Sequence, residues 1–193
     1  MDWPIRFPAE MGAGTISVRP YDHDDAADLL GPLGDERVWE HMSRAAPADA
    51  AELDEVIQAR LGDGYRESFT IRQDGRAAGI TSVLFDPHEP AGVEIGGTLL
   101  GPDVWGTGVN TEVKRLLLAV IFRHGAQWVV LRTDERNGRS AAAIRKLGAT
   151  DLGLRQEEHL VRRDGTRRRS RIFRLDRPGP PGPGPPGRSS VTS

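Results

Sequence analysis

The amino-acid sequence predicts an α/β (α+β) protein with a mixed, mostly antiparallel central sheet and helices on both faces. Segments with strand spacing alternate with segments with helical spacing along most of the chain. Asp74-Gly75 separates two strand-like runs, which is a strong hairpin signal and indicates antiparallel pairing. Residues 92–147 then follow the order strand, loop, helix, strand and helix, and this unit makes the predicted sheet a mixed one.

The first elements follow from apolar spacing and from helix-stop residues. Residues 15–19 (TISVR) predict a short strand, and residues 22–30 begin a helix with an acidic first turn. Residues 48–61 carry apolar side chains at helical spacing, and the glycine-containing stretch 62–64 is expected to end that helix.

Strands are expected at residues 68–72 and 77–85, on either side of the turn at 73–76. Residues 92–100 (GVEIGGTLL) continue as a strand. Gly96-Gly97 in its middle indicates a β-bulge or a close approach of another backbone.

A helix is predicted to begin near Asn110, which we interpret as its N-cap, with Glu112 in the first turn. Its core-facing stripe comprises Val113, Leu116, Leu117, Val120 and Ile121.

Residues 128–132 (WVVLR) then predict a buried strand, and Asn137 is expected to cap a helix over 140–147 that Gly148 ends. Residues 152–160 and 168–175 complete the pattern as a long hairpin that turns at Asp164-Gly165.

The length of 193 residues is enough for one domain with a core of its own. We expect an N-terminal extension at 1–14, one domain at 15–176 and a disordered tail at 177–193, which consists almost wholly of Pro, Gly and Ser. The N-terminus has no signal-peptide pattern and no segment is apolar enough to span a membrane, so we expect a cytoplasmic protein.

The charge balance, 26 Lys plus Arg against 28 Asp plus Glu, gives no global reason to expect nucleic acid or a membrane as partner. With no cysteine, the chain has no disulfide, no thiolate metal ligand and no acyl-cysteine chemistry. The five histidines lie far apart without metal-ligand spacing, so no metal site is expected.

The stretch Trp105-Gly106-Thr107-Gly108, directly before the helix, is a poor strand and a poor helix. Its two glycines allow backbone N–H groups to turn toward a guest, and a helix N-terminus attracts negative charge. This loop therefore predicts an anion site.

Two motifs in order, IGGTLLGPDVWGTGVNTE and LRTDERNGRSAAAIRKLGA, resemble the GNAT acetyltransferases, and among these the ribosomal-protein N-acetyltransferase (RimJ/RimL-like) branch. The resemblance covers about residues 15–176. It implies acetyl-CoA as co-substrate, with its pyrophosphate on the loop amides and its pantetheine arm near Asn137. The implied cofactor-binding residues are Leu99, Leu100, Trp105, Gly106, Thr107, Gly108, Val109, Asn110, Thr111 and Asn137. Trp105 and Asn110 depart from the family pattern, in which Gln or Arg and Gly or Ala are usual.

The implied chemistry needs a base for the acceptor amine and an acid for the departing thiolate. Glu94, two residues before the glycine pair, is our candidate base, acting directly or through water. The tyrosine that many family members use as acid would fall at Ile144, so Ser140 or a water molecule is the candidate.

The resemblance further implies that the acceptor enters between the first helical region and the last hairpin, which points to Trp39, His41 and Glu158. We expect a primary amine on a protein N-terminus or a small molecule, and we leave a homodimer open. The arginines of the last hairpin are interpreted as a solvated strand face. The rival interpretation, favoured by Ile144, is an inactive CoA-binding or RNA-binding regulatory module on the same scaffold.

Overall fold

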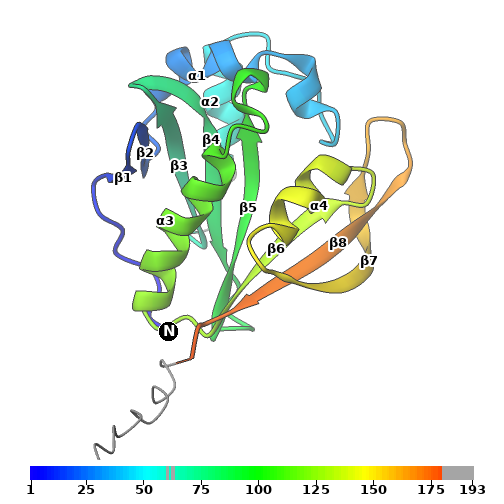
Figure 1. Cartoon of the computed structure of the whole chain (residues 1–193). Coiled ribbons are helices and arrows are strands. Elements are labelled where there is room, and N and C mark those ends of the chain that lie inside the picture. Colours follow the sequence, from blue (N-terminus) through cyan, green and yellow to red (C-terminus); the bar gives the residue numbers. More distant parts are fainter. Residues whose placement is uncertain (60, 62–63, 180–193) are drawn as a thin grey trace, which may run out of the picture.

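One sheet of eight strands runs through the molecule, in the order β1-β2-β3-β4-β5-β6-β8-β7 (Figure 1). The computed structural model describes residues 1–59, 61 and 64–179, without the side chains of Glu158 and His159. Within this part β5 and β6 form the parallel pair and the other neighbours are antiparallel, which confirms the predicted fold class.

The expected strands and helices are all present, with ends shifted by a few residues. Their bounds are β1 (Met11–Ala13), β2 (Ile16–Pro20), α1 (Asp25–Leu33), the 3-10 helix η1 (Glu36–Trp39), α2 (Ala50–Gln58), β3 (Arg66–Gln73), β4 (Arg76–Phe85), β5 (Gly92–Leu100), the 3-10 helix η2 (Pro102–Val104), α3 (Val109–Arg123), β6 (Trp128–Asp134), α4 (Gly138–Arg145), β7 (Thr150–Val161) and β8 (Arg167–Asp176). The sequence did not predict β1 or the two 3-10 helices.

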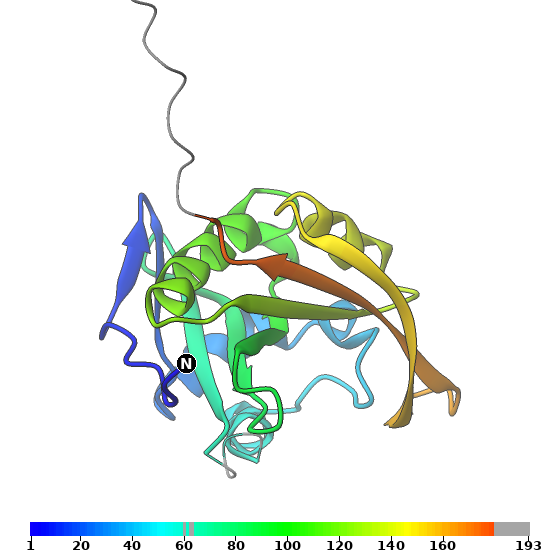
Figure 2. The same cartoon turned by 90° about the horizontal axis from the view of Figure 1, so that it is seen from below.

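Helices cover both faces of the sheet, as expected (Figures 1 and 2). The apolar side chains of α3 and α4 pack with those of the sheet in one buried cluster. The apolar side chains of α1, η1 and α2 form a second cluster that includes Ile80 of β4 and Leu99 of β5. The central strands β4 and β5 supply both clusters because successive side chains point to opposite faces.

The N-terminal segment, expected as an extension, packs onto the sheet. Met11 pairs with Val18 across β1 and β2 and is buried together with Ile5. The ring of Trp3 stacks on Phe85 with 5.1 Å between the centroids. The first residues are therefore part of the folded core. Most of the expected tail (180–193), and residues 62 and 63 of the expected helix stop, lie outside the described residues.

Two hairpins form at the predicted turns. β3 and β4 meet at Asp74 and Gly75, which both adopt a left-handed backbone with φ of 51° and 75°. β7 and β8 turn near Gly165, and Arg162 beside this turn donates hydrogen bonds to the buried carboxylate of Asp134 at 2.7 and 2.9 Å. That ion pair holds the long hairpin over the end of β6.

The two central strands diverge in the middle of the sheet. β5 and β6 pair at Gly92 with Trp128, at Val93 with Val129 and at Glu94 with Val130. Beyond these pairs they separate in a V shape (Figure 1). In the described part of the chain, no helix is both long and apolar enough to cross a membrane.

The predicted irregularity of β5 is a bulge against β4. Ile80 pairs with Leu99 and Ser82 with Gly96, so Gly97 and Thr98 together face Thr81. Gly97 takes a left-handed φ of 59°, which only glycine adopts readily. The bulge therefore follows the last β5–β6 pair, at Glu94, by three residues.

Candidate active site

A cavity of about 840 Å³ lies in the opening between β5 and β6. Its walls come from β5, β6, the loop after β5, α3, α4 and the β7–β8 hairpin, with contributions from η1 and the segment after it and from β3 and β4. The predicted site residues that line it are His41, Glu94, Leu99, Leu100, Trp105, Gly106, Gly108, Asn110, Thr111, Asn137 and Ser140. Candidate cofactor, catalytic and acceptor residues thus reach one space from separate elements.

The glycine loop has the backbone that the sequence predicted, but the helix starts two residues earlier. Gly106 and Gly108 have left-handed φ values of 77° and 97°, and Gly108 is the N-cap of α3. The prediction of Asn110 as N-cap is therefore wrong, because the left-handed glycine already turns the chain into the helix. A Cβ placed on either glycine would meet no atom within 4 Å, so the space above the loop backbone is open.

Asn110 instead lies in the first turn of α3, where its side chain borders the cavity. Its Oδ1 atom is buried and has no hydrogen-bond partner in the described part of the chain. A buried acceptor without a partner costs free energy unless a ligand or water supplies a donor. The pantetheine arm of CoA carries amide N–H donors of this kind.

Trp105 packs beside the loop and contacts both the end of β5 and the first turn of α4. Its indole N–H donates to the Leu100 carbonyl at 2.8 Å, which ties the ring to the end of β5. The guanidinium of Arg139, in the first turn of α4, lies 3.4 Å from the ring centroid, and that of Arg37 lies 5.9 Å away. The cation–π contact with Arg139 therefore links the loop after β5 to the first turn of α4.

Leu99 and Leu100 are buried core side chains, one in each apolar cluster. Both also line the cavity, and the resemblance implies that their backbone groups face the ligand. Val109 is also a core residue, and the Thr107 hydroxyl donates to the Val104 carbonyl at 2.8 Å. Neither Thr107 nor Val109 lines the cavity.

Glu94 occupies the last position at which β5 still pairs with β6. Its carboxylate accepts from Arg132 Nε at 2.7 Å, and Arg132 Nη1 lies 3.3 Å from Glu157 Oε1. Burial raises the pKa of Glu94, and the Arg132 charge only partly opposes that effect. A half-buried carboxylate with a raised pKa is a suitable proton acceptor at a reaction centre.

The first turn of α4 brings the second candidate group into the cavity. Asn137 caps the helix as predicted, with its Oδ1 accepting the Ser140 N–H at 2.9 Å. Ser140 borders the cavity, and Ile144, one turn later, borders it too but is buried and apolar. Among the α4 residues of this wall, Ser140 carries the hydroxyl.

A comparison with protein families matches residues 15–150 to the acetyltransferase (GNAT) domain. The chain belongs to the GNAT acetyltransferase family. It is an acetyl-CoA-dependent acyltransferase, as that family is. A search of curated proteins returned no match.

Solved structures agree with this family assignment. A protein from T. thermophilus described as an acetyltransferase is 28% identical, with a TM-score of 0.78 over 89% of this chain and 91% of that one. A GNAT-family protein from Chromobacterium violaceum ATCC 12472 is 24% identical, with a TM-score of 0.80 over 90% of both chains. The Salmonella typhimurium acetyltransferase that modifies the N-terminal serine of ribosomal protein L7/L12 shares the fold, with 18% identity and a TM-score of 0.72 over 85% of this chain and 96% of that one.

The acceptor side of this GNAT domain differs from expectation at Trp39. Trp39 is fully buried, its indole N–H donates to the Leu33 carbonyl at 2.6 Å, and it does not line the cavity. It is a core residue, and we assign it no substrate contact. His41, two residues later, is half-buried and does line the cavity. The side chain of Glu158 lies outside the described residues, whereas its neighbour Glu157 is buried and faces Arg132.

Sequence reasoning missed Lys114, Arg132 and Thr98. Lys114 is only 3% exposed and borders the cavity from α3. Its position in the sequence could have indicated burial. Lys114 precedes Leu117 by three residues and Ile121 by seven, so it lies on the apolar face of the helix. Thr98 lies in the bulge and Arg132 on β6, and neither has a comparable signal in the sequence.

The arginines of the last hairpin do not form a free basic stripe. Five of them pair with carboxylates within 3.2 Å: Arg162 with Asp134 and Glu135, Arg163 with Glu36, Arg169 with Glu135, Arg171 with Asp151, and Arg174 with Asp176. The contact from Arg163 to Glu36 also links the hairpin to η1 across the acceptor side.

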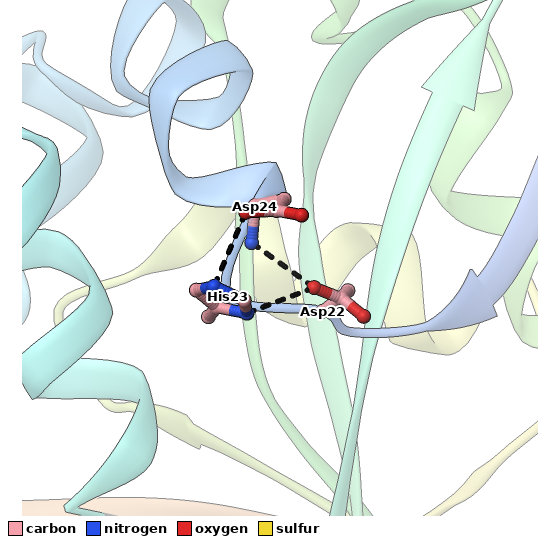
Figure 3. Close-up of side chains that lie close together, drawn as sticks. All are labelled: Asp22, His23 and Asp24. Carbon is pink, nitrogen blue, oxygen red and sulfur yellow. Dashed lines mark hydrogen bonds and ion pairs between the residues drawn. The ribbon is translucent and has the colours of Figure 1, made fainter.

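One exposed group of potential metal ligands occurs in the described residues. Asp22, His23 and Asp24 precede α1 with their ligand atoms within 4.8 Å of one another (Figure 3). The two His23 nitrogens each lie 3.1 Å from a carboxylate oxygen of the neighbouring aspartates. None of the three borders the cavity, and we assign no metal to them.

Proposed function

We propose that this GNAT protein transfers the acetyl group of acetyl-CoA to a primary amine by direct attack in a ternary complex. On its two motifs we also place it in the RimJ/RimL-like branch. The observation that carries the proposal is that Glu94 of β5 and Ser140 of α4 reach the same cavity as the glycine loop. A base, an acid and an anion site are thus held by a rigid frame around one space.

The donor side is built from the loop and the first turn of α3. Acetyl-CoA supplies an activated thioester when bound. The amides of residues 106–111 face its pyrophosphate, and the Asn110 amide oxygen accepts from its arm. The backbone of Leu99 and Leu100, together with Asn137, orients the arm in the opening between the strands, and Trp105 with Arg139 forms the wall at its outer end.

Glu94 takes a proton from the acceptor amine, directly or through one water molecule. An amine must be neutral to attack, and its reference pKa is about 8 for an N-terminus and about 10.4 for lysine. The raised pKa of Glu94 makes it a stronger base than an exposed glutamate. Arg132, held between Glu94 and Glu157, fixes the direction of that carboxylate.

Ser140 relays a proton to the departing sulfur and regains one from water, while the proton taken by Glu94 returns to solvent; an ordered water is the alternative donor to the sulfur. Its position in the first turn of α4 is fixed by the Asn137 cap. Ile144, where a tyrosine is common in the family, has no proton to give.

The acceptor enters between His41 and the β7–β8 hairpin, where Glu158 is also proposed to contact it. The distant Salmonella typhimurium neighbour modifies an N-terminal serine, which supports a protein N-terminus as one class of acceptor. A small-molecule amine is the other class.

One observation favours a second candidate function, a CoA-binding regulatory module without turnover. Ile144 leaves the usual acid position apolar. The RNA-binding form of this candidate loses support because most arginines of the hairpin are already paired.

The test is a thiol-release assay with acetyl-CoA over a panel of peptides and small amines, with mass spectrometry of each acceptor. Release of CoA together with acetylation of one acceptor is the expected result. Tight binding of acetyl-CoA without release for every acceptor, in a protein that folds normally, would instead establish the regulatory module.

A further inference from the structure

Lys114 forms a closed ring of hydrogen bonds with two threonines. Its amine donates to Thr81 Oγ1 at 3.0 Å and to Thr98 Oγ1 at 2.5 Å, and the two hydroxyl oxygens lie 2.7 Å apart. Each of the three polar groups therefore bonds to the other two. Thr81 and Thr98 are the residues that face each other across the bulge, so the amine joins both sides of it.

This buried lysine is unusual because it has no carboxylate partner among the residues that the structure describes. Within the described part of the chain, no carboxylate oxygen lies within 4.0 Å of its amine. A buried ammonium without a counter-ion is costly, and burial accordingly lowers the pKa of Lys114 to about 7. A neutral amine has two N–H donors, which matches the two hydroxyl oxygens that accept from it, whereas an ammonium would carry a third N–H that no group in the described part of the chain accepts.

The position of the ring connects it to the reaction centre. The bulge lies between Glu94, where β5 and β6 last pair, and the backbone of Leu99 and Leu100. Lys114 and Thr98 also line the cavity themselves. A shift of the bulge would change the direction of the β5 amides that border the opening.

We propose that Lys114 is a positioning residue for acetyl transfer, whose amine clamps Thr81 to Thr98 and so fixes the β5 backbone from Gly97 to Leu100 against the bound thioester. The proposal rests on the proposed function, since it assigns this backbone to the thioester.

The test compares Lys114→Met with Thr98→Val and Thr98→Ser. Methionine keeps an unbranched apolar side chain, one atom shorter than lysine, and removes its hydrogen bonds. Valine removes the Thr98 hydroxyl at nearly constant shape, and serine retains that hydroxyl. Ser68→Ala is the matched control, because it removes another buried hydroxyl pair, Ser68 with Ser82 at 2.9 Å, without touching the cavity.

Two measurements separate this proposal from the proposed function. Hydrogen exchange of the β5 amides reports the clamp whether or not the enzyme turns over, and we expect faster exchange at residues 96–100 in Lys114→Met and Thr98→Val. In steady-state kinetics, we expect both variants to lower kcat by about tenfold or more with little change in the Kd for acetyl-CoA. Thr98→Ser and Ser68→Ala should keep the wild-type values.

Unchanged β5 exchange in a folded Lys114→Met protein would overturn the clamp. Faster exchange with unchanged kcat would overturn its role in catalysis. If the wild-type protein releases no thiol with any amine, the proposed function fails, but the clamp can still be tested by hydrogen exchange. The clamp predicts that acetyl-CoA slows exchange of the β5 amides in the wild-type protein and slows it less in Lys114→Met; equal slowing in both would overturn it.

Discussion

Glu94 and Arg132 form an ion pair, with 2.7 Å between Oε2 and Nε, at the point where the two central strands begin to separate. The pair keeps the carboxylate at the base of the V-shaped opening while leaving it partly accessible. The same arginine faces Glu157 of β7, so the proposed base is connected to the hairpin that borders the acceptor side.

Replacement of Glu94 by Gln tests the proposed base. We expect a large loss of kcat with nearly unchanged affinity for acetyl-CoA, because the glycine loop is untouched. Since burial raises the pKa of Glu94, wild-type activity should fall as the pH drops through a value above the ordinary carboxyl range. The variant should lack that acidic limb, and unchanged kcat at all pH values would remove Glu94 from the mechanism.

Ser140→Ala tests the proposed acid. If Ser140 holds the proton for the departing sulfur, kcat should fall by about tenfold to a hundredfold while the Kd for acetyl-CoA stays close to the wild-type value. The Asn137 cap accepts from the backbone N–H of residue 140, so the helix should remain intact. A wild-type kcat in this variant would assign the acid role to water.

Gly108→Val tests the anion loop. The φ of 97° at Gly108 disfavours any side chain, so a stability loss of about 1–2 kcal/mol is expected in addition to weaker binding. Gly14→Val is the matched control for strain, because Gly14 is exposed, has a φ of 59° and lies far from the loop in the turn between β1 and β2. Calorimetric titration should show weaker acetyl-CoA binding in the first variant alone, and equal affinity in both would contradict the loop assignment.

Lys114 should give the protein a distinctive dependence of stability on pH. Its pKa is about 7 in the folded state and near 10.5 when unfolded, so between these values the unfolded chain binds more protons. The Lys114 contribution to folding stability should therefore rise with pH from about 7 to 10.5, by on the order of 5 kcal/mol at most. The melting temperature of the wild-type protein should therefore rise relative to that of Lys114→Met between pH 7 and 10.5. A difference between the two melting temperatures that stays constant over this range would contradict a buried amine without a counter-ion.

The order of the elements was predictable because the apolar spacing and the turn residues are local signals. The hairpin at Asp74-Gly75 and the cap at Asn137 were predicted from a few adjacent residues. Gly96-Gly97 predicted a bulge or a close backbone approach, and the structure has a bulge at Gly97 and Thr98. The N-cap at Gly108 was not predicted, because asparagine is the more common N-cap residue and Asn110 lies two positions later. The left-handed φ of Gly108 is visible only in the structure.

Long-range contacts account for what the sequence could not predict. Trp39 belongs to the core because α1 and α2 pack around it, which no local pattern reveals. Arg132 and its two carboxylate partners lie on three different strands, and the ring of Lys114, Thr81 and Thr98 joins residues up to 33 positions apart. These contacts depend on how the strands pair and how α3 packs on the sheet, which local sequence patterns do not determine.

Calorimetric titration of the wild-type protein with acetyl-CoA tests the central claim most directly. The glycine loop, the unpartnered Asn110 oxygen and the cavity predict saturable binding with one site per chain. Binding should weaken when S-acetylpantetheine, which lacks the pyrophosphate, replaces the whole molecule. Absence of acetyl-CoA binding by a folded protein would contradict the assignment of this cavity to acetyl-CoA.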